Sequence, residues 1–509
     1  MKHFLLLVFH AVLMFPFSGV AQTKSQTPFL TLKDAINEAL LNNRTLQIDR
    51  INPEIARMTL RASWGYYDPL FLSTAKKQNE TQLNAFDPNN PGLETGFDSH
   101  SEIVNGGLTG FLPSGLSYSL GGGYNHSDGS RNLLNFDSYR LDSAITLQQP
   151  LLKNFWIDLP RYTIRVNKRK LQISELGVYF TAMNVINDTQ QAYYHLVFAW
   201  ENLRVVQGLL DTRDKFLKSI QRQVELGRLT VLEERVAASQ KENVQVTIIT
   251  ASNTLALAAN ALRTHMGVTG TNWTQDFYLP VDRLAVMPES LDLASSWQRG
   301  IARRPDLQQL VKTVQNAELN MKFRKNQLFP SLDVIGGYGR RGASSLQAFP
   351  PDQPSAHFSD ALDQLQHADA PSDMIGLVLS FPLTRTFDRA NYQASKELKR
   401  QADLTVKQHE ETILREVSDA IFTARFSYDR VAAARRATEF AGAALKAEEE
   451  KLANGTTSVN NVLQLQADLA GSQAAEVQTK EEYNRAISQL RFAEGTILDE
   501  HNIVFDFSE

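Results

Sequence analysis

The sequence predicts an α+β membrane protein in which long helices alternate with strands and one structural unit occurs twice. Three features predict this fold class: long intervals without proline, strand segments with one apolar and one polar face, and a succession of motifs that recurs in both halves. The chain has 509 residues, and its 52 basic and 56 acidic residues nearly balance. This balance gives no reason to expect a nucleic-acid partner.

The first residues, MKHFLLLVFHAVLMFPFSGVAQ, follow the order of a secretory signal peptide. Lys2 precedes an apolar run that starts at Phe4, and small residues follow at Gly19 and Ala21. We therefore predict that residues 1–21 are a signal peptide and that the mature chain is exported. A membrane anchor is the alternative, but the apolar run is short and ends in a cleavage-like site.

Cysteine is absent, so the chain has no disulfides, no thiolate metal site and no cysteine nucleophile. After the predicted cleavage site, no uncharged apolar run approaches the ~20 residues that a spanning helix requires. If the exported chain enters a membrane, we expect it to do so as a β-barrel, which pairs all of its backbone polar groups.

One unit is duplicated along the chain. LTLKDAINEALLNNRTLQ aligns with LDLASSWQRGIARRPDLQ at an offset that also places Pro69 on Pro330, 330 − 69 = 261 positions. Farther on, Gly227 aligns with Gly455, 455 − 227 = 228 positions later. These matches predict a duplicated architecture.

The two copies set the predicted domains. The first repeat covers residues 22–267, with a strand region at about 69–150. The second covers residues 291–509, with a strand region at about 330–383. Residues 268–290 are predicted to be a linker between them. Each repeat should consist of a helix, its strand region and a long helical hairpin.

Two intervals have the composition of very long helices. No proline occurs between Arg161 and Tyr278, or after Pro382. A continuous helix from Arg161 to Leu226 would be ~100 Å long at 1.5 Å per residue, which is too long for a compact globule. In the second interval, apolar residues recur at steps of three and four, as in a coiled-coil seam: Ile413, Val417, Ala420, Ala424, Tyr428 and Val431.

The strand segments alternate between two faces. In SYRLDSAITLQQP, the apolar face carries Tyr139, Leu141, Ile145 and Leu147. The polar face carries Arg140, Asp142, Thr146 and Gln148. SGLSYSLGGGYNH has the same arrangement. Two-faced segments of ~10 residues are typical of a barrel with lipid outside and water inside. The edge of a soluble sandwich is the alternative.

The motifs LTLKDAINEALLNNRTLQ, RRPDLQ, LFPSLDV, LQQPLL, LSFPL and GTTSVNNVLQLQADLAGSQ occur in an order that resembles the TolC family of outer-membrane efflux proteins. The resemblance covers nearly the whole mature chain. It implies a homotrimer in which each protomer gives four strands to a shared twelve-stranded β-barrel in outer-membrane lipid. Long helices would continue the barrel into the periplasm as an α-helical tunnel.

The resemblance also assigns partners and the junctions between helices and strands. The implied partners are a periplasmic adaptor protein and an inner-membrane transporter of the RND or ABC type. Pro69 and Pro330 would lie where ascending helices become strands, and Pro150 and Pro382 where descending strands become helices. Proline suits these positions because it cannot donate the N–H that a continuing helix needs.

The strand region of the first copy is the longer one. Its prolines, Pro69 and Pro150, are 150 − 69 = 81 positions apart, against 382 − 330 = 52 positions in the second copy. Residues 101–127 contain enough alternating sequence for an additional hairpin. This hairpin either extends above the barrel as an extracellular loop or adds strands to the wall, and we favour the loop.

Two turns are candidates for binding a partner. Gly227 is followed three residues later by Thr230, and Gly455 by Ser458. Glycine just past a long helix and a hydroxyl residue three positions later predict a helix C-cap followed by an N-cap. The resemblance adds that these turns lie at the periplasmic tip, where the adaptor docks.

The residues just past the turns are candidates for the channel entrance. The family often has acidic residues there, but the matching positions in the second copy are Asn461 and Gln464. In the first copy, Glu233 aligns with Asn461 at the 228-residue offset, and Glu234 adjoins it. These two glutamates either face the pore or only favour the dipole of their helix.

No catalytic, cofactor or metal site is predicted. His409 is followed by two glutamates but not by a second histidine four residues on, so the zinc-protease motif is absent. We therefore expect a channel of a tripartite efflux or type I secretion system rather than an enzyme. The alternatives are a coiled-coil envelope protein without a pore and a secreted hydrolase on a helical scaffold.

Overall fold

The computed structural model describes residues 29–86, 94–131, 134–269, 279–349, 352 and 354–507, so the predicted signal peptide lies outside the described residues. The chain divides into two compact units, each made of separate segments. The first unit contains Met1–Asn43, Asp188–Pro288 and Phe426–Arg485. The second contains Arg44–Asn187, Glu289–Arg425 and Ala486–Glu509.

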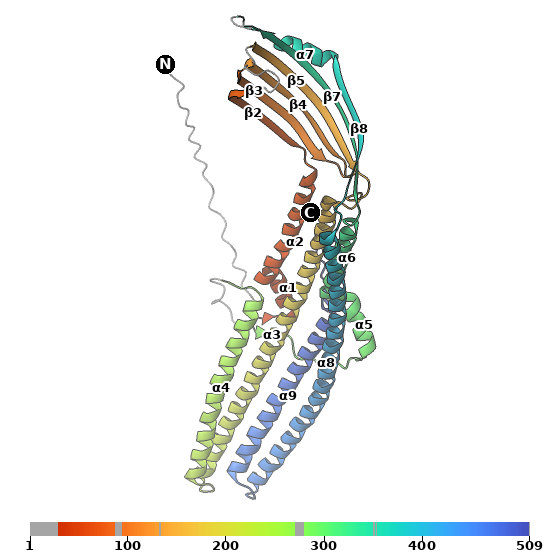
Figure 1. Ribbon diagram of the computed structural model, residues 1–509. Helices are drawn as coiled ribbons and strands as arrows, with labels where there is room; N and C mark the ends of the chain where they lie inside the picture. The colour runs from red at the N-terminus through yellow and green to blue at the C-terminus, as the bar shows by residue number, and fades with distance from the viewer. Residues whose placement is uncertain are drawn as a thin grey trace, which may run out of the picture. The chain divides into compact units, whose positions relative to one another are not determined.

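Helices account for most of the described chain (Figure 1). Their bounds are α1 (Leu32–Asn42), α2 (Arg44–Trp64), η1 (Gly65–Tyr67), α3 (Leu159–Glu225), α4 (Val231–His265), α5 (Leu293–Arg303), α6 (Pro305–Asn326), α7 (Phe358–His367), α8 (Thr386–Ala453), α9 (Val459–Ala493) and α10 (Ile497–Glu500). Helices α3 and α8 have 67 and 68 residues, which confirms the long helices predicted from the proline-free intervals. None of the helices described is long and apolar enough to cross a membrane.

The predicted seam of α8 is largely buried. Its members Ile413 and Val417 are fully buried, whereas Tyr428 is half-exposed in the single chain. The part of the seam that lies in the second unit packs against α6 and α9. The cluster there comprises Leu307, Ile413, Val417, Ala420, Ile421, Leu490 and Ala493. The three- and four-residue spacing thus places one stripe of α8 against its neighbours.

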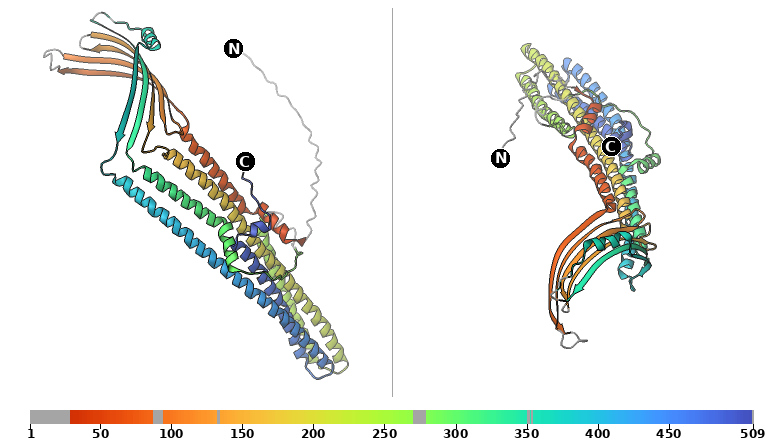
Figure 2. Two further views of the ribbon diagram at one scale, coloured as in Figure 1. Left: turned by 90° about the vertical axis from the view of Figure 1, so that its right-hand side faces the viewer. Right: turned by 90° about the horizontal axis from the view of Figure 1, so that it is seen from above.

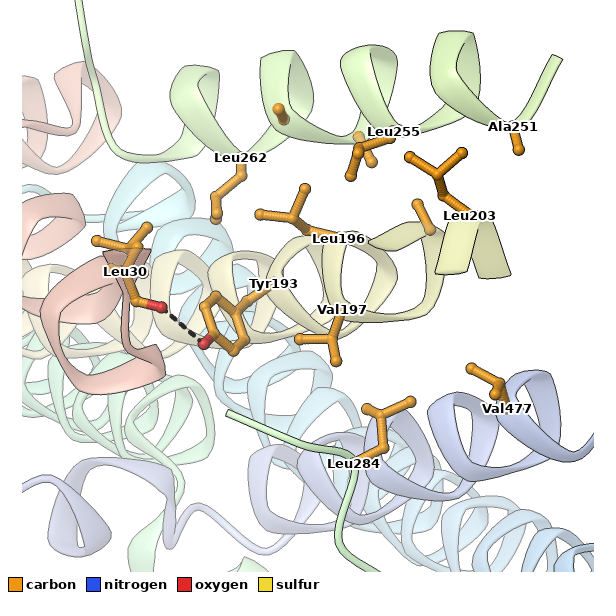
Figure 3. Close-up of a cluster of buried hydrophobic side chains, with 14 of the residues drawn as sticks. Leu30, Tyr193, Leu196, Val197, Leu203, Ala251, Leu255, Leu262, Leu284 and Val477 are labelled. Carbon is orange, nitrogen blue, oxygen red and sulfur yellow. Dashed lines mark hydrogen bonds between the residues drawn. The ribbon is translucent and has the colours of Figure 1, made fainter. Parts of the chain in front are cut away.

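The core of the first unit surrounds Tyr193 of α3 (Figure 3). Leu196 and Leu203 of α3 face Leu255 and Leu262 of α4 across this core. The Tyr193 hydroxyl donates a hydrogen bond to the Leu30 carbonyl at 2.9 Å. Leu30 belongs to β1 (Phe29–Leu30), a short strand that pairs in parallel with β6 (Leu279–Pro280). This buried tyrosine therefore ties the β1–β6 pair to the helical hairpin.

One curved antiparallel sheet lies in the second unit (Figure 2). Its strands, in spatial order, are β2 (Leu70–Phe86), β3 (Glu94–Phe111), β4 (Ser117–Arg131), β5 (Leu134–Pro150), β7 (Ser331–Ala348) and β8 (Ala370–Ser380). Pro69 directly precedes β2 and Pro330 directly precedes β7. Pro150 ends β5, 159 − 150 = 9 positions before Leu159 opens α3, and Pro382 lies between β8 and α8.

The placement of residues 101–127 as an extracellular loop is wrong. They belong to β3 and β4, which lie inside the sheet between β2 and β5. The physical reason is that both strands satisfy their backbone hydrogen-bonding groups on both sides, which a protruding hairpin could not do. Helix α7 was not predicted either, and it packs on β7, with Phe358 against Tyr139 of β5.

Candidate functional site

Both long helices end in the same glycine turn at one end of the first unit (Figure 1). The N–H of Gly227 donates to the carbonyl of Val224 at 2.9 Å, and the N–H of Arg228 donates to that of Gln223 at 2.9 Å. The turn at Gly455 repeats both hydrogen bonds at 3.0 Å. This is the Schellman motif, and it requires the positive φ of 72° and 71° that the two glycines adopt.

The next helix of each hairpin starts at a hydroxyl cap. Thr230 and Glu233 form a capping box, in which the Thr230 hydroxyl accepts from the Glu233 N–H at 3.4 Å. The Glu233 carboxylate in return accepts from the Thr230 N–H at 2.8 Å. In the second hairpin, the Ser458 hydroxyl accepts from the Asn461 N–H at 3.3 Å. The cap geometry predicted for both turns is therefore present.

Each of the four candidate entrance residues bonds within its own hairpin. Glu233 is engaged in the capping box, and Glu234 accepts from the Gln221 amide at 3.1 Å. Asn461 donates to the Thr457 hydroxyl at 3.0 Å. Gln464 donates to the Asp468 carboxylate at 2.9 Å. Asn461 and Gln464 are exposed, whereas the two glutamates are half-buried.

Two carboxylates near the second turn, Asp468 and Glu448, were not predicted from the sequence. Asp468 lies one helical turn beyond Gln464, and Glu448 lies on α8 within reach of the α8–α9 turn. Hydrogen bonds from Thr457 and then from Lys451 lower the pKa of Glu448. The 228-residue offset aligns neither of them with a carboxylate in the first copy, because 468 − 228 = 240 is Gln240 and 448 − 228 = 220 is Ile220. Comparison of the repeats therefore could not find them.

An apolar cluster and a buried guanidinium join the two hairpins near these turns. The cluster comprises Ile220 of α3, Ala237 of α4, and Val459 and Leu463 of α9. Arg213 of α3 is 3% exposed and donates from Nη2 to the Leu463 carbonyl at 2.7 Å. Burial lowers the pKa of Arg213. The two turns are thus held side by side by contacts that lie about one to four helical turns away from them.

The sheet offers a second polar surface, on the side away from its apolar residues. Arg140 and Asp142 of β5 share this side with Arg341 of β7, because Asp142 pairs directly with Arg341. An open hollow of about 680 Å³ lies there, and these three residues are among those that line it. The polar face predicted for β5 is therefore continued by a charged side chain of β7.

The described residues contain no cluster of metal ligands. Among them, no group of three or more His, Cys, Asp or Glu residues could hold a metal ion. His409, rejected above as a zinc ligand, forms a hydrogen bond of 2.8 Å with Asp306 of the RRPDLQ motif.

Comparison with known proteins finds one similar family. Residues 297–496 match the model of the family described as "Outer membrane efflux protein". This part of the chain, 496 − 297 + 1 = 200 of its 509 residues, is similar to the outer membrane efflux protein family. The outer membrane efflux protein BepC of Brucella suis biovar 1 is 25% identical over 318 residues, which are 62% of this chain. The match spans 65% of that relative, slightly less than two thirds of its length.

Solved structures of outer-membrane channels have the same fold. The CmeC channel of Campylobacter jejuni matches with a TM-score of 0.64 and 16% identity, over 94% of this chain and 90% of that one. The open MtrE channel of Neisseria gonorrhoeae matches with a TM-score of 0.62 and 15% identity, over 92% and 89%. The resemblance to the TolC family is therefore confirmed. The fold is that of solved outer-membrane channels.

Proposed function

We propose that the protein is the outer-membrane channel of a tripartite efflux or type I secretion system, extending from the outer membrane into the periplasm. It would pass substrates from a periplasmic adaptor and an inner-membrane RND or ABC-type pump to the exterior. The observation that carries this proposal is the combination of a two-faced curved sheet with two helical hairpins that end in matching glycine turns. The match of residues 297–496 to the efflux family supports it.

The proposed assembly is a homotrimer, because the sheet of one chain is open. Its strand order begins with β2 and ends with β8, and an open edge in a bilayer would leave backbone groups without partners. Three copies would close one barrel and one helical tunnel. Mass measurement in detergent and conductance in a planar bilayer test this assembly together. A conducting monomer would disprove the trimer, and a trimer without conductance would favour the envelope-protein alternative.

Two structural repeats per chain are part of this proposal. Each long hairpin ends at a glycine in a Schellman motif, Gly267 after α4 and Gly495 after α9, with φ of 71° and 72°. Gly267 lies against the backbone at the junction of α1 and α2, and Gly495 lies against the junction of α5 and α6. Equivalent contacts at positions matched by the 228-residue offset support the duplication.

The turns with Gly227 and Thr230 and with Gly455 and Ser458 are proposed to dock the adaptor. Gly455→Pro should leave an exported trimer but weaken adaptor binding, because proline cannot adopt φ of 71° and removes the N–H that closes the turn. Nothing lies within 4 Å of a Cβ at this position, so the damage stays local. Site-specific cross-linking to the adaptor measures the effect. Gly471→Ala, a substitution inside α9, is the control. Unchanged cross-linking of the proline variant would exclude this turn as the contact.

Three-fold symmetry would repeat each entrance side chain three times around the pore. We expect Asn461→Asp to raise cation preference, because a ring of carboxylates concentrates negative potential in a narrow mouth. Glu233→Gln and Glu234→Gln should lower whatever preference the native channel has. Glutamine at position 233 is the suitable change because it can keep the capping box while removing the charge.

The reversal potential under a salt gradient in a planar bilayer measures these effects. At acidic pH the new aspartate at position 461 should become protonated, and the gain in cation preference should disappear. An unchanged reversal potential at neutral pH would show that Asn461 does not line the entrance, whatever the fold.

A further inference from the structure

The hairpin of β3 and β4 is a full part of the sheet. All 15 residues of β4 pair with β3 on one side and with β5 on the other. The pairing of β3 with β2 continues from Leu70 opposite Thr109 to Gln82 opposite Phe97 without a break. A hairpin paired on both outer sides over its whole length has no free edge with which to detach from the wall.

The hairpin also continues the apolar face of the flanking strands. Direct pairing links Phe71 of β2 to Leu108, Leu108 to Leu120, and Leu120 to Ile145 of β5. This row of four apolar side chains crosses four adjacent strands on one face. Phe71, Leu120 and Ile145 are 69%, 51% and 40% exposed in the single chain, so the row has no cover within the protomer. An unbroken apolar row suits contact with lipid.

On β3, β4 and β5 the opposite face is polar at the same level of the sheet. Thr109 of β3 pairs with Ser119 of β4, and Ser119 pairs with Thr146 of β5. Each of these three polar residues is the direct chain neighbour of a residue in the apolar row: Leu108, Leu120 or Ile145. The hairpin therefore alternates in phase with β5, as strands of one wall must.

The turn between β3 and β4 is fastened to the start of α3. The Arg161 guanidinium donates to the carbonyl of Pro113 and forms an ion pair of 3.4 Å with Asp158. The Gln149 amide donates to the carbonyl of Ser114 at 3.4 Å. The turn thus lies at the end of the sheet where β5 leads into the helices. A loop that extends from the opposite, extracellular end would not make these contacts.

We propose that each protomer contributes six strands to the barrel wall, so that three copies close a barrel of eighteen strands. The inference rests on the proposed trimeric channel and departs from the twelve strands that the family resemblance implies. The occupant of each free edge is a second copy of this chain, with β2 of one copy beside β8 of the next. Strand β2 leaves the helices and β8 returns to them, so the two would pair antiparallel.

The consequence is a wider outer opening. Barrel diameter grows roughly linearly with strand number, so eighteen strands give about one and a half times the width of twelve. The hairpin thereby sets the size of cargo that the barrel can pass, independently of the helical entrance.

Cysteine labelling of the exported trimer tests the hairpin in the wall. The chain has no cysteine, so each single substitution is labelled uniquely. We expect Thr109→Cys and Ser119→Cys to react with a water-soluble maleimide, and Leu108→Cys and Leu120→Cys to react only with a maleimide dissolved in the bilayer. Reaction of all four with the water-soluble reagent would overturn the inference.

The control pair lies on β5 and separates this inference from the proposed function. Thr146→Cys and Ile145→Cys should alternate between the two reagents in any channel of this fold. If they alternate and the hairpin positions do not, the channel stands and the eighteen-stranded barrel fails. If the β5 pair does not alternate either, the proposed function fails as well.

A disulfide measurement gives a second, independent readout. In a wall that contains the hairpin, Phe71 and Ile145 are separated by three strand spacings, about 14 Å, which no disulfide can bridge. Phe71→Cys combined with Ile145→Cys should therefore remain reduced within the protomer. The directly paired Leu108→Cys and Leu120→Cys should oxidise under the same conditions. An intramolecular disulfide between positions 71 and 145 would place β2 beside β5 and overturn the inference.

Discussion

Replacing Gly267 by alanine is expected to lower the free energy of unfolding by about 2 kcal/mol or more. Gly267 ends α4 with φ of 71°, a backbone conformation that costs an L-residue roughly 1–2 kcal/mol. A Cβ at this position would also lie 2.2 Å from the backbone oxygen of Asn42. Backbone cannot rotate away as a side-chain tip can, so α4 must shift from the junction of α1 and α2.

Two matched variants calibrate this result. Gly495→Ala meets the same φ penalty, but its nearest backbone atom would be 3.1 Å away, so we expect a smaller loss. Gly471 lies inside α9 with nothing within 4 Å of a Cβ, and Gly471→Ala should be neutral or stabilise by about 0.5–1 kcal/mol. Thermal unfolding followed by far-ultraviolet circular dichroism in detergent ranks the three. Equal midpoints for the variants at positions 267 and 471 would contradict the close contact at Asn42.

Local rules were sufficient for the features that depend on neighbouring residues. Absence of proline predicted α3 and α8, and alternation predicted the two faces of β5. The glycine turns followed from the requirement for positive φ, which is a property of a single residue. What Gly267 packs against could not be predicted, because Asn42 lies 267 − 42 = 225 positions earlier in the chain.

The additional hairpin shows where sequence patterns become ambiguous. Residues 101–127 alternate in the same way whether they extend as a loop or pair inside a wall. The distinction depends on hydrogen bonds to β2 and β5 and on the contact of Arg161 with the β3–β4 turn. Helix α7 was missed because its ten residues form too short a pattern between strands.

Loss of the Arg304 guanidinium is expected to destabilise the protein by about 3 kcal/mol, the typical cost of breaking a buried ion pair. Arg304 is 3% exposed and donates to Asp306 at 2.6 and 3.1 Å, and it also bonds Glu416 of α8. His409 of α8 contacts the same Asp306 carboxylate. Arg304→Met would leave the half-buried Asp306 carboxylate with His409 as its remaining partner of the two. This cluster explains why the RRPDLQ segment joins the start of α6 to α8.

The neighbouring arginine provides the control. Arg303 pairs with Asp499 at the surface, where the side chains are 48% and 64% exposed. An exposed pair contributes about 0–1 kcal/mol, so Arg303→Met should change the unfolding midpoint little. Arg304→Lys should fall between the two methionine variants, because lysine keeps the charge but loses the two-pronged contact with Asp306.

The pH dependence separates an ion-pair role from simple packing. Burial alone would raise the pKa of Asp306, but hydrogen bonds and charge from Arg304, followed by those from His409, hold it below the usual value. A pKa lowered by folding adds stability that is present above the unfolded value of about 3.9 and is lost as pH falls through the folded pKa.

In Arg304→Met the burial effect prevails, so the Asp306 carboxylate opposes folding at neutral pH. The difference in unfolding midpoint between native protein and variant should therefore be largest near pH 7 and shrink steadily below about pH 4. A difference that stays constant from pH 7 to pH 3 would mean that Arg304 acts through its volume rather than its charge.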